Sequence, residues 1–274
     1  MSTAVSTDSG GRAAAAAPAG AALRAAAAAV RRTRWWFELL TIGWLCWVYD
    51  IVLNLEPLRA HVALAHGRSV LNLERTLGLD PEKALNAWLA AQHTLGLIVS
   101  DYYDNAHFAV TLGVLAWLWW ARPGAYRPLR SALVLVNLLG FVVFWLYPLA
   151  PPRMLGGFTD VVSSTHAFGS WHTGSLASHA NEFAAMPSLH MAWAVWCAVA
   201  IWRATERPWA RALGVAHVCL TAFAVLATAN HYLLDLLAGA AVMALAFWLV
   251  RAAGEAARAA RRRQGSAATA ATPL

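Results

Sequence analysis

Three short motifs contain the side chains that could carry out chemistry. APPR ends at Arg153, MPSLH contains Ser188 and His190, and NHYLLD contains His231 and Asp235. His231 and Asp235 are four residues apart, so on a helix they would share one face, one turn apart. Asp235 could then accept a hydrogen bond from one imidazole nitrogen of His231, which is how an orienting acid activates a nucleophile. An acid within a membrane span is costly, which makes Asp235 a functional candidate.

The other residues of these motifs suit a phosphate group. Ser188 and His190 stand at the predicted start of a helix, where unpaired backbone amides attract phosphate. Arg153 supplies a planar fork of donors for phosphate oxygens. Of two histidines, one can attack phosphorus while the other protonates the departing oxygen. A zinc or manganese site formed by His190, His231 and Asp235 is the alternative, but it would leave Arg153 and Ser188 without a purpose.

The composition is that of a membrane protein. Of the 274 residues, 59% are hydrophobic and only 13% are charged. Apolar runs of about 16 to 20 residues start near Trp35, Ala106, Leu129, Ser188, Ala212 and Leu233. A span needs roughly 17 to 25 residues, so the shorter runs require tilt or local thinning of the bilayer. We predict an all-α bundle of six transmembrane helices.

The distribution of basic residues predicts which side each loop faces. If the amino terminus is cytoplasmic, residues 1–34 and 251–274 together with the loops at 122–130 and 203–211 hold 16 of the 21 Lys and Arg residues. This asymmetry follows the positive-inside rule and places 55–104 and 148–187 on the outer side, together with the three motifs. The arginines do not form a groove with interleaved aromatic residues, so nucleic acid is not an expected partner.

The chain divides into a membrane domain and two tails. Residues 1–33 are Ala-rich and predict a disordered tail, residues 34–254 form the catalytic membrane domain, and residues 255–274 predict a disordered basic tail. The first tail lacks the short apolar core and cleavage site of a secretory signal, because its arginines directly precede Trp35. We therefore expect the first span to remain in the mature protein.

Two short helices are predicted on the outer side at 58–91. Asp80 followed by Pro81 marks the start of the second, as a cap residue before proline at the first helical position. Leucines recur near helical spacing in both segments. The two helices could lie at the membrane surface as a lid, or they could be connecting helices that pack on the bundle.

A polar cluster, SDYYDNAHF, lies at the outer end of the second span. It includes Asp101, Tyr103, Asn105 and His107. Acceptor groups gathered beside a histidine suit the recognition of hydroxyl groups, as an inositol or a sugar alcohol would require. Tyrosine at this depth is also an ordinary interface anchor, so both interpretations stay open.

In these motifs the sequence resembles the type 2 phosphatidic acid phosphatase superfamily, and more closely its inositol phosphorylceramide synthase branch. The resemblance extends over roughly 35–251 and rests on APPR, MPSLH and NHYLLD in that order. It implies that His231 is a nucleophile that becomes phosphohistidine and that Asp235 is its partner. It further implies that His190 is the general acid, that Arg153 and Ser188 bind phosphate, and that no metal or other cofactor takes part.

Three positions depart from the phosphatase pattern. Leu146 stands where the pattern has a lysine, Leu189 where it has a glycine, and Val225 where it has an arginine. Two cations that would bind phosphate are therefore missing. This favours the synthase-like branch, which handles phosphodiesters, because a dianionic phosphomonoester would have fewer positive partners.

We therefore predict a membrane-embedded lipid phosphoester phosphotransferase or phosphatase that resembles inositolphosphotransferases. Its substrate would be a phospholipid or a polyprenyl phosphate, with inositol or a sugar alcohol as a possible acceptor. The predicted location is the bacterial cytoplasmic membrane, with the active site facing outward. A simple phosphatase of phosphatidic acid or polyprenyl phosphate is the alternative. A non-enzymatic lipid-phosphate carrier is another, although a carrier would not need the pair of His231 and Asp235.

Overall fold

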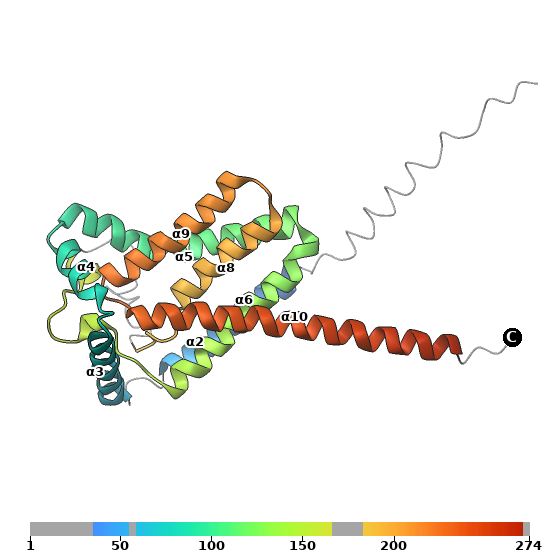
Figure 1. Cartoon of the computed structure of the whole chain (residues 1–274), viewed down its shortest axis with the longest axis horizontal. Coiled ribbons are helices and arrows are strands. Elements are labelled where there is room, and N and C mark those ends of the chain that lie inside the picture. The colour runs from blue at the N-terminus through green and yellow to red at the C-terminus, as the bar shows by residue number, and fades with distance from the viewer. Residues whose placement is uncertain (1–34, 55–58, 166–182, 271–274) are drawn as a thin grey trace, which may run out of the picture.

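The protein is helical throughout the part that the computed structural model describes, residues 35–54, 59–165 and 183–270 (Figure 1). The α-helices are α2 (Trp35–Asn54), α3 (Ala60–Leu77), α4 (Pro81–Ala90), α5 (His93–Ala121), α6 (Pro123–Leu146), α7 (Val161–Thr165), α8 (Leu189–Ala204), α9 (Pro208–Ala227) and α10 (Leu233–Ala270), with a 3₁₀ turn η2 (Pro152–Met154). Within these ranges the only β-pairing is one isolated bridge between Leu149 and Ala184. The predicted all-α class is confirmed.

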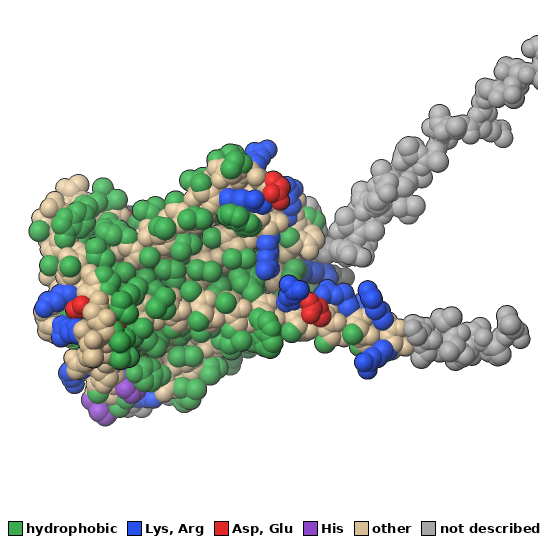
Figure 2. Space-filling view, viewed as in Figure 1, with side chains coloured by type: hydrophobic (Ala, Val, Ile, Leu, Met, Phe, Trp, Pro, Cys, Tyr) green, Lys and Arg blue, Asp and Glu red, His purple; other side chains and the backbone are tan. Residues whose placement is uncertain are grey.

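Among the described residues, three helices are long and apolar enough to cross a membrane, namely α6, α9 and the first 32 residues of α10. The apolar core of α2 and the whole of α8 are shorter. Each of the six predicted runs coincides with a helix, but only three of them meet the requirements for a span, so the six-span topology stays a prediction. Figure 2 shows a hydrophobic band between two ends at which charged side chains gather, as expected for a bundle embedded in lipid.

Helix α8 is the centre of the bundle and packs against α5, α6, α9 and α10. Its buried face carries Ala192, Ala194 and Ala200, and such small residues let neighbouring helices approach closely. Trp196 is completely buried, and its indole N–H donates a 2.9 Å hydrogen bond to the carbonyl of Leu129 in α6. This core fixes the direction of α8, so that its amino-terminal residues are held at one end of the bundle.

The two predicted short helices are present as α3 and α4. Asp80 is the cap residue of α4 and Pro81 is its first residue, as expected. Both helices lie at the end of the bundle opposite to the carboxyl-terminal end of α10 (Figure 1). Helix α4 packs on α5, α7 and α9, whereas α3 contacts η2 and α10.

Helix α10 continues to Ala270, past residue 254 where the sequence places the end of the membrane domain. Residues 255–264 of this extension are exposed, and it contains the basic run that ends at Arg263. The extension therefore projects from the bundle as a helix rather than packing on it (Figure 1).

Candidate active site

Backbone hydrogen bonds bring the three motifs together at one end of the bundle. The amide of Arg153 donates to the carbonyl of Ala229 at 2.8 Å, which joins APPR to the loop before α10. The amide of Ser188 donates to the carbonyl of Asp235 at 3.0 Å, which joins MPSLH to NHYLLD. Segments that are about 35 to 80 residues apart in the sequence therefore form one site.

The two histidines of the site face each other. His190 lies in the first turn of α8, and His231 lies in the loop directly before α10. Nε2 of His231 is 3.4 Å from Nδ1 of His190. His231 is 4% exposed, whereas His190 is partly exposed. A reacting group that reaches His190 from outside would therefore meet both imidazole rings.

The other nitrogen of His231 is held by acceptors. Nδ1 lies 2.9 Å from the carbonyl oxygen of Ala185 and 3.4 Å from Oδ2 of Asp235. Because a carbonyl oxygen can only accept, the contact with Ala185 requires the proton on Nδ1. Nε2 then keeps its lone pair, directed toward His190, as a nucleophile requires.

Asp235 contacts His231 as predicted, but the two residues do not share a helix. Helix α10 begins at Leu233, so the contact crosses its amino-terminal end. Oδ2 of Asp235, which is completely buried, also accepts a 3.0 Å hydrogen bond from the amide of Tyr232. The carboxylate therefore fixes the loop before α10 and the ring of His231 at the same time, while the shorter contact of that ring is with Ala185.

Ser188 and Arg153 are joined through their backbone amides to the segment that contains His231. Ser188 is the cap residue of α8, and its Oγ accepts the amide of Met191 at 3.3 Å. This bond leaves the hydroxyl proton of Ser188 available for an anion. Arg153 lies in η2 with its side chain 4% exposed, and Nε is 3.6 Å from Oδ2 of Asp160. Both predicted phosphate-binding residues thus lie in segments whose backbone is bonded to the segment that contains His231 and Asp235.

The predicted acceptor cluster on α5 divides into two pairs. The ring of Tyr103 stacks on His190 with centroids 4.7 Å apart, and the ring of His107 meets His190 edge-on at 4.3 Å. Asn105 is exposed and donates to the carbonyl of Asp101. A position two residues along a helix points about 200° around it, so Asp101 and Asn105 face away from His190. Only Tyr103 and His107 adjoin the site.

The three departures from the phosphatase pattern fit the structure without cations. Leu189 packs on α6, where a methyl group added to Gly140 would lie 2.9 Å from its Cδ2. Val225 is 1% exposed in an apolar cluster, and its carbonyl accepts the amide of His231. Leu146 is 68% exposed at the end of α6. Val225 therefore contributes to the site through its backbone, and its side chain belongs to the core.

The geometry bears on the alternative of a metal site. Asp235 lies on the Nδ1 side of the His231 ring, whereas His190 lies on its Nε2 side. One ion cannot bind both ring nitrogens of the same imidazole, so this arrangement does not let the three side chains share one ion. It does suit a nucleophile between an orienting acceptor and an acid.

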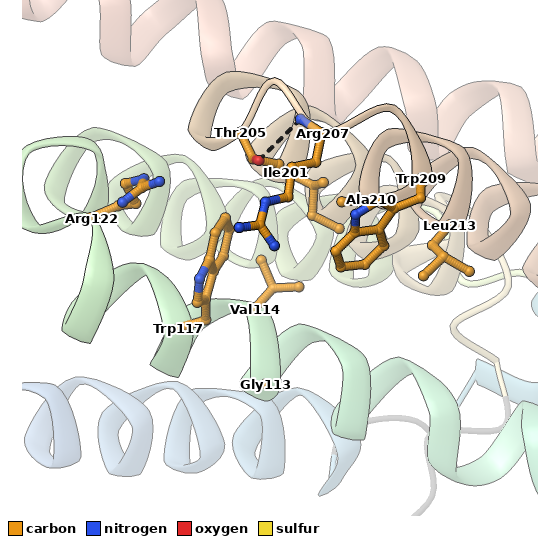
Figure 3. Close-up of a pocket in the computed structure, with 10 residues that line it drawn as sticks. All are labelled: Gly113, Val114, Trp117, Arg122, Ile201, Thr205, Arg207, Trp209, Ala210 and Leu213. Atoms are coloured by element: carbon orange, nitrogen blue, oxygen red, sulfur yellow. Dashed lines mark hydrogen bonds between the residues drawn. The ribbon is translucent and has the colours of Figure 1, made fainter.

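The cavity drawn in Figure 3 lies away from these residues. It has a volume of about 430 Å³ and is formed by the ends of α5, α8 and α9 near the basic loops. Trp117, Arg122, Arg207 and Trp209 are among its lining residues, and no residue of the three motifs is. The predicted site is therefore at the other end of α8.

Comparison with known proteins identifies the family. Residues 68–249 match the model of a family described as the PAP2 superfamily, and this range includes all three motifs. No curated protein and no solved structure matches the chain significantly.

Proposed function

The chain belongs to the PAP2 superfamily, and from this premise we propose that it transfers or hydrolyses a lipid phosphoester through a phosphohistidine at His231. Membership supports a lipid phosphatase or phosphotransferase type of function in a membrane. The observation that carries the finer proposal is the pair of histidines. His231 has its Nδ1 held by acceptors and its Nε2 3.4 Å from His190.

The proposed first step forms the covalent intermediate. Nε2 of His231 attacks phosphorus, the bond from phosphorus to the lipid oxygen breaks, and protonated His190 gives its proton to that oxygen. Ser188 and Arg153 bind the oxygens of phosphorus that do not react. Asp235 and the carbonyl of Ala185 stabilise the positive charge that develops on the ring of His231.

The second step releases the intermediate. The oxygen of a hydroxyl group attacks phosphorus, His190 takes its proton, and the bond to Nε2 of His231 breaks. Water as the attacking molecule gives hydrolysis, and an alcohol gives transfer. Tyr103 and His107 lie against His190, so an alcohol held by them would have its hydroxyl group beside the base.

A phosphodiester substrate suits the site better than a phosphomonoester. A monoester carries close to two negative charges, whereas a diester carries one. Positions 146 and 225, where the phosphatase pattern has cations, hold Leu146 and Val225, and the side chain of Val225 is in the core. We therefore favour transfer from a phospholipid to inositol or a sugar alcohol over simple hydrolysis of phosphatidic acid or polyprenyl phosphate. A non-enzymatic carrier would not need the oriented His231.

The proposed side of the membrane follows from charge. The motifs lie where α8 and α10 begin, and the basic loop between α8 and α9 lies at the other end of α8. Under the positive-inside rule this arrangement supports our proposal that the site is at the outer face of a bacterial cytoplasmic membrane.

Product analysis tests this function. The purified protein is incubated with a panel of labelled phospholipids and polyprenyl phosphates, with and without inositol or sugar alcohols, and the products are identified by mass. We expect a phosphorus-containing headgroup on the added alcohol, and no product from His231→Ala. Release of inorganic phosphate alone would establish the phosphatase alternative. Binding without any product would support the carrier.

A further inference from the structure

Two completely buried carboxyl groups lie next to each other between α3 and α4, and one of them contacts the start of α10. Glu74 belongs to α3 and Glu82 to α4, and both are 0% exposed. Oε1 of Glu74 accepts a 2.7 Å hydrogen bond from the amide of Leu234, in the first turn of α10. Glutamate is almost never fully buried unless it is paired, so two such residues, one of them bonded to the helix that carries Asp235, need an explanation.

Burial disfavours ionisation of both carboxyl groups at neutral pH. Burial raises the pKa of Glu74, and with the contributions of the neighbouring Glu82 and Asp235 it reaches about 8. Burial also raises the pKa of Glu82, with Asp80 and Asp235 adding to the effect. Two carboxylates in one site share a proton because like charges disfavour full ionisation.

No cation compensates the pair among the described residues. The groups that act on it are Asp80, directly before α4, Asp235 on α10, and Tyr232 in the loop before α10. Arg75, the residue after Glu74, forms its ion pair with Asp80 at the surface, at 3.8 Å. The positive charge of Arg75 is thus already engaged by Asp80. The titratable neighbours of Glu74 and Glu82 are acids and a tyrosine.

The unpaired oxygen atoms of the two side chains also indicate that the carboxyl groups share a proton. Within the part of the chain that is described, Oε2 of Glu74 and both carboxyl oxygens of Glu82 have no hydrogen bond of ordinary geometry, although the amide of Glu82 is close enough to lower the pKa of its own carboxyl group. Each such buried acceptor costs roughly 1–3 kcal/mol. A proton held between the two carboxyl groups supplies the missing donor, because a protonated carboxyl group donates to the other.

The pair is connected to the catalytic residues by a short series of contacts. Glu74 holds the amide of Leu234, and the next residue is Asp235. Asp235 in turn accepts the amide of Tyr232 and contacts His231. Glu74 thus acts on His231 through the first turn of α10 rather than by contact with it.

Helix α3 is also fixed to the APPR segment. The amide of Ala150 donates to the carbonyl of Ala63 at 3.1 Å, and the hydroxyl of Tyr232 donates to the carbonyl of Ala150 at 2.9 Å. A methyl group added to Gly67 would lie 2.8 Å from that carbonyl oxygen. Because α3 is in close contact with both APPR and α10, a displacement of α3 would affect both sides of the site.

We propose that Glu74 and Glu82 share one proton and in this way act as positioning residues, which hold the first turn of α10 so that Asp235 and His231 keep their geometry. The inference rests on the proposed function. When both carboxyl groups ionise, their repulsion pushes α3 and α4 apart, the bond from Leu234 to Glu74 is strained, and the orientation of His231 is lost.

The pH dependence has a definite sign. The folded protein holds the proton to a higher pH than the unfolded chain, whose glutamates have a pKa of 4.5. The stabilisation is therefore complete below about pH 4.5 and is lost as the pH rises through about 8. Activity that depends on the pair falls over the alkaline part of the same range.

The central variants are Glu82→Gln and Glu74→Gln, with Glu255→Gln as the control because Glu255 is exposed on α10. Each is measured in detergent between pH 5.5 and 9.5, for thermal midpoint and for hydrolysis of bis(4-nitrophenyl) phosphate. In Glu82→Gln the amide donates to Glu74 in place of the shared proton. We expect the activity of this variant at pH 7 to be within about twofold of wild type. Its thermal midpoint should change less with pH, and the alkaline decline of its kcat should move to higher pH.

Glu74→Ala should behave differently, since it removes the acceptor of Leu234 and leaves Glu82 alone. We expect kcat to fall about tenfold or more with little change in KM. If Glu74→Ala does not fold, Glu74→Gln and Glu82→Gln still test the shared proton and the positioning role.

A midpoint whose pH dependence is the same in Glu82→Gln and wild type would overturn the shared proton. Wild-type kcat and an unchanged pH profile in Glu82→Gln, Glu74→Gln and Glu74→Ala would overturn the positioning role. Absence of activity from the wild type on every phosphoester would contradict the proposed function, while the midpoints would still test the pair.

Discussion

Replacement of Gly239 by alanine tests how strictly the contact between α8 and α10 sets the site. A methyl group at this position would overlap the carbonyl oxygen of Ser188 and would lie 3.1 Å from its carbonyl carbon and 3.4 Å from its nitrogen. These atoms are backbone, so no side chain can rotate away. The start of α8 must move from α10 by on the order of 1 Å to reach ordinary contact distances.

The expected loss is larger for activity than for stability. Overpacking costs about 1–3 kcal/mol, and alanine returns about 0.5–1 kcal/mol through its better helix propensity, so the protein should still fold. The same movement separates His190 from His231, whose nitrogens are 3.4 Å apart, and a 1 Å misplacement can cost about 100-fold. We therefore expect kcat of Gly239→Ala to fall about 100-fold.

The assay compares hydrolysis of a nitrophenyl phosphoester with the thermal midpoint in detergent. Gly113→Ala is the matched control, because Gly113 also lies within a helix and an added methyl group there meets nothing within 4 Å. It should keep its activity and should not lose stability. Gly239→Ala with wild-type kcat would refute the argument that this close approach positions the histidines.

The remaining predictions concern roles, cofactors and topology. The activity of His190→Ala should fall roughly 10²- to 10⁴-fold on a natural phospholipid but much less on a nitrophenyl phosphoester, whose leaving group needs no proton. His231→Ala should be inactive on both substrates. Rescue of His231→Ala by the activated leaving group would reverse the assignment. Asp235→Asn should slow both substrates, because it weakens the hold on the His231 ring, and unchanged rates would remove Asp235 from the mechanism. Activity should survive extensive chelation, and loss that zinc or manganese alone restores would favour the metal site. A cysteine at Gly156 should react with an impermeant thiol reagent in intact cells, and one at Gly124 should not, because the basic loops are predicted to be cytoplasmic. Both positions have open space for the new side chain. The opposite labelling pattern would invert the topology.

Periodicity and motif order were sufficient to predict the helices and the convergence of the site. Each apolar run coincides with a helix, and Asp80 with Pro81 marks the start of α4 because local cap chemistry decides where a helix begins. The three motifs meet because they occur at matching ends of neighbouring helices. The number of full spans did not follow from the apolar runs, since α8 has only 16 residues. The central place of α8 in the core depends on helix packing, which the periodicity of one segment does not express.

The details that depend on tertiary contacts were not predictable. The acceptor closest to His231 is the backbone carbonyl of Ala185, and a backbone carbonyl has no signature in the sequence. On α5, residue types alone grouped Asn105 with Tyr103, although the helix turns the two away from each other. Glu74 lies three residues after Leu71 on the buried face of α3, a spacing that could have indicated a buried acid.

The most direct test of the account is to trap the covalent intermediate. Wild-type protein turning over a phosphoester is quenched under alkaline conditions, which preserve the acid-labile phosphohistidine, and the peptide that contains His231 is sequenced by mass spectrometry. The account predicts a phosphoryl or phospho-headgroup adduct on His231 that forms and decays with turnover, that persists in His190→Ala with an activated substrate, and that is absent from His231→Ala. An adduct on another residue, or steady turnover with neither an adduct nor a burst of the first product, would contradict it.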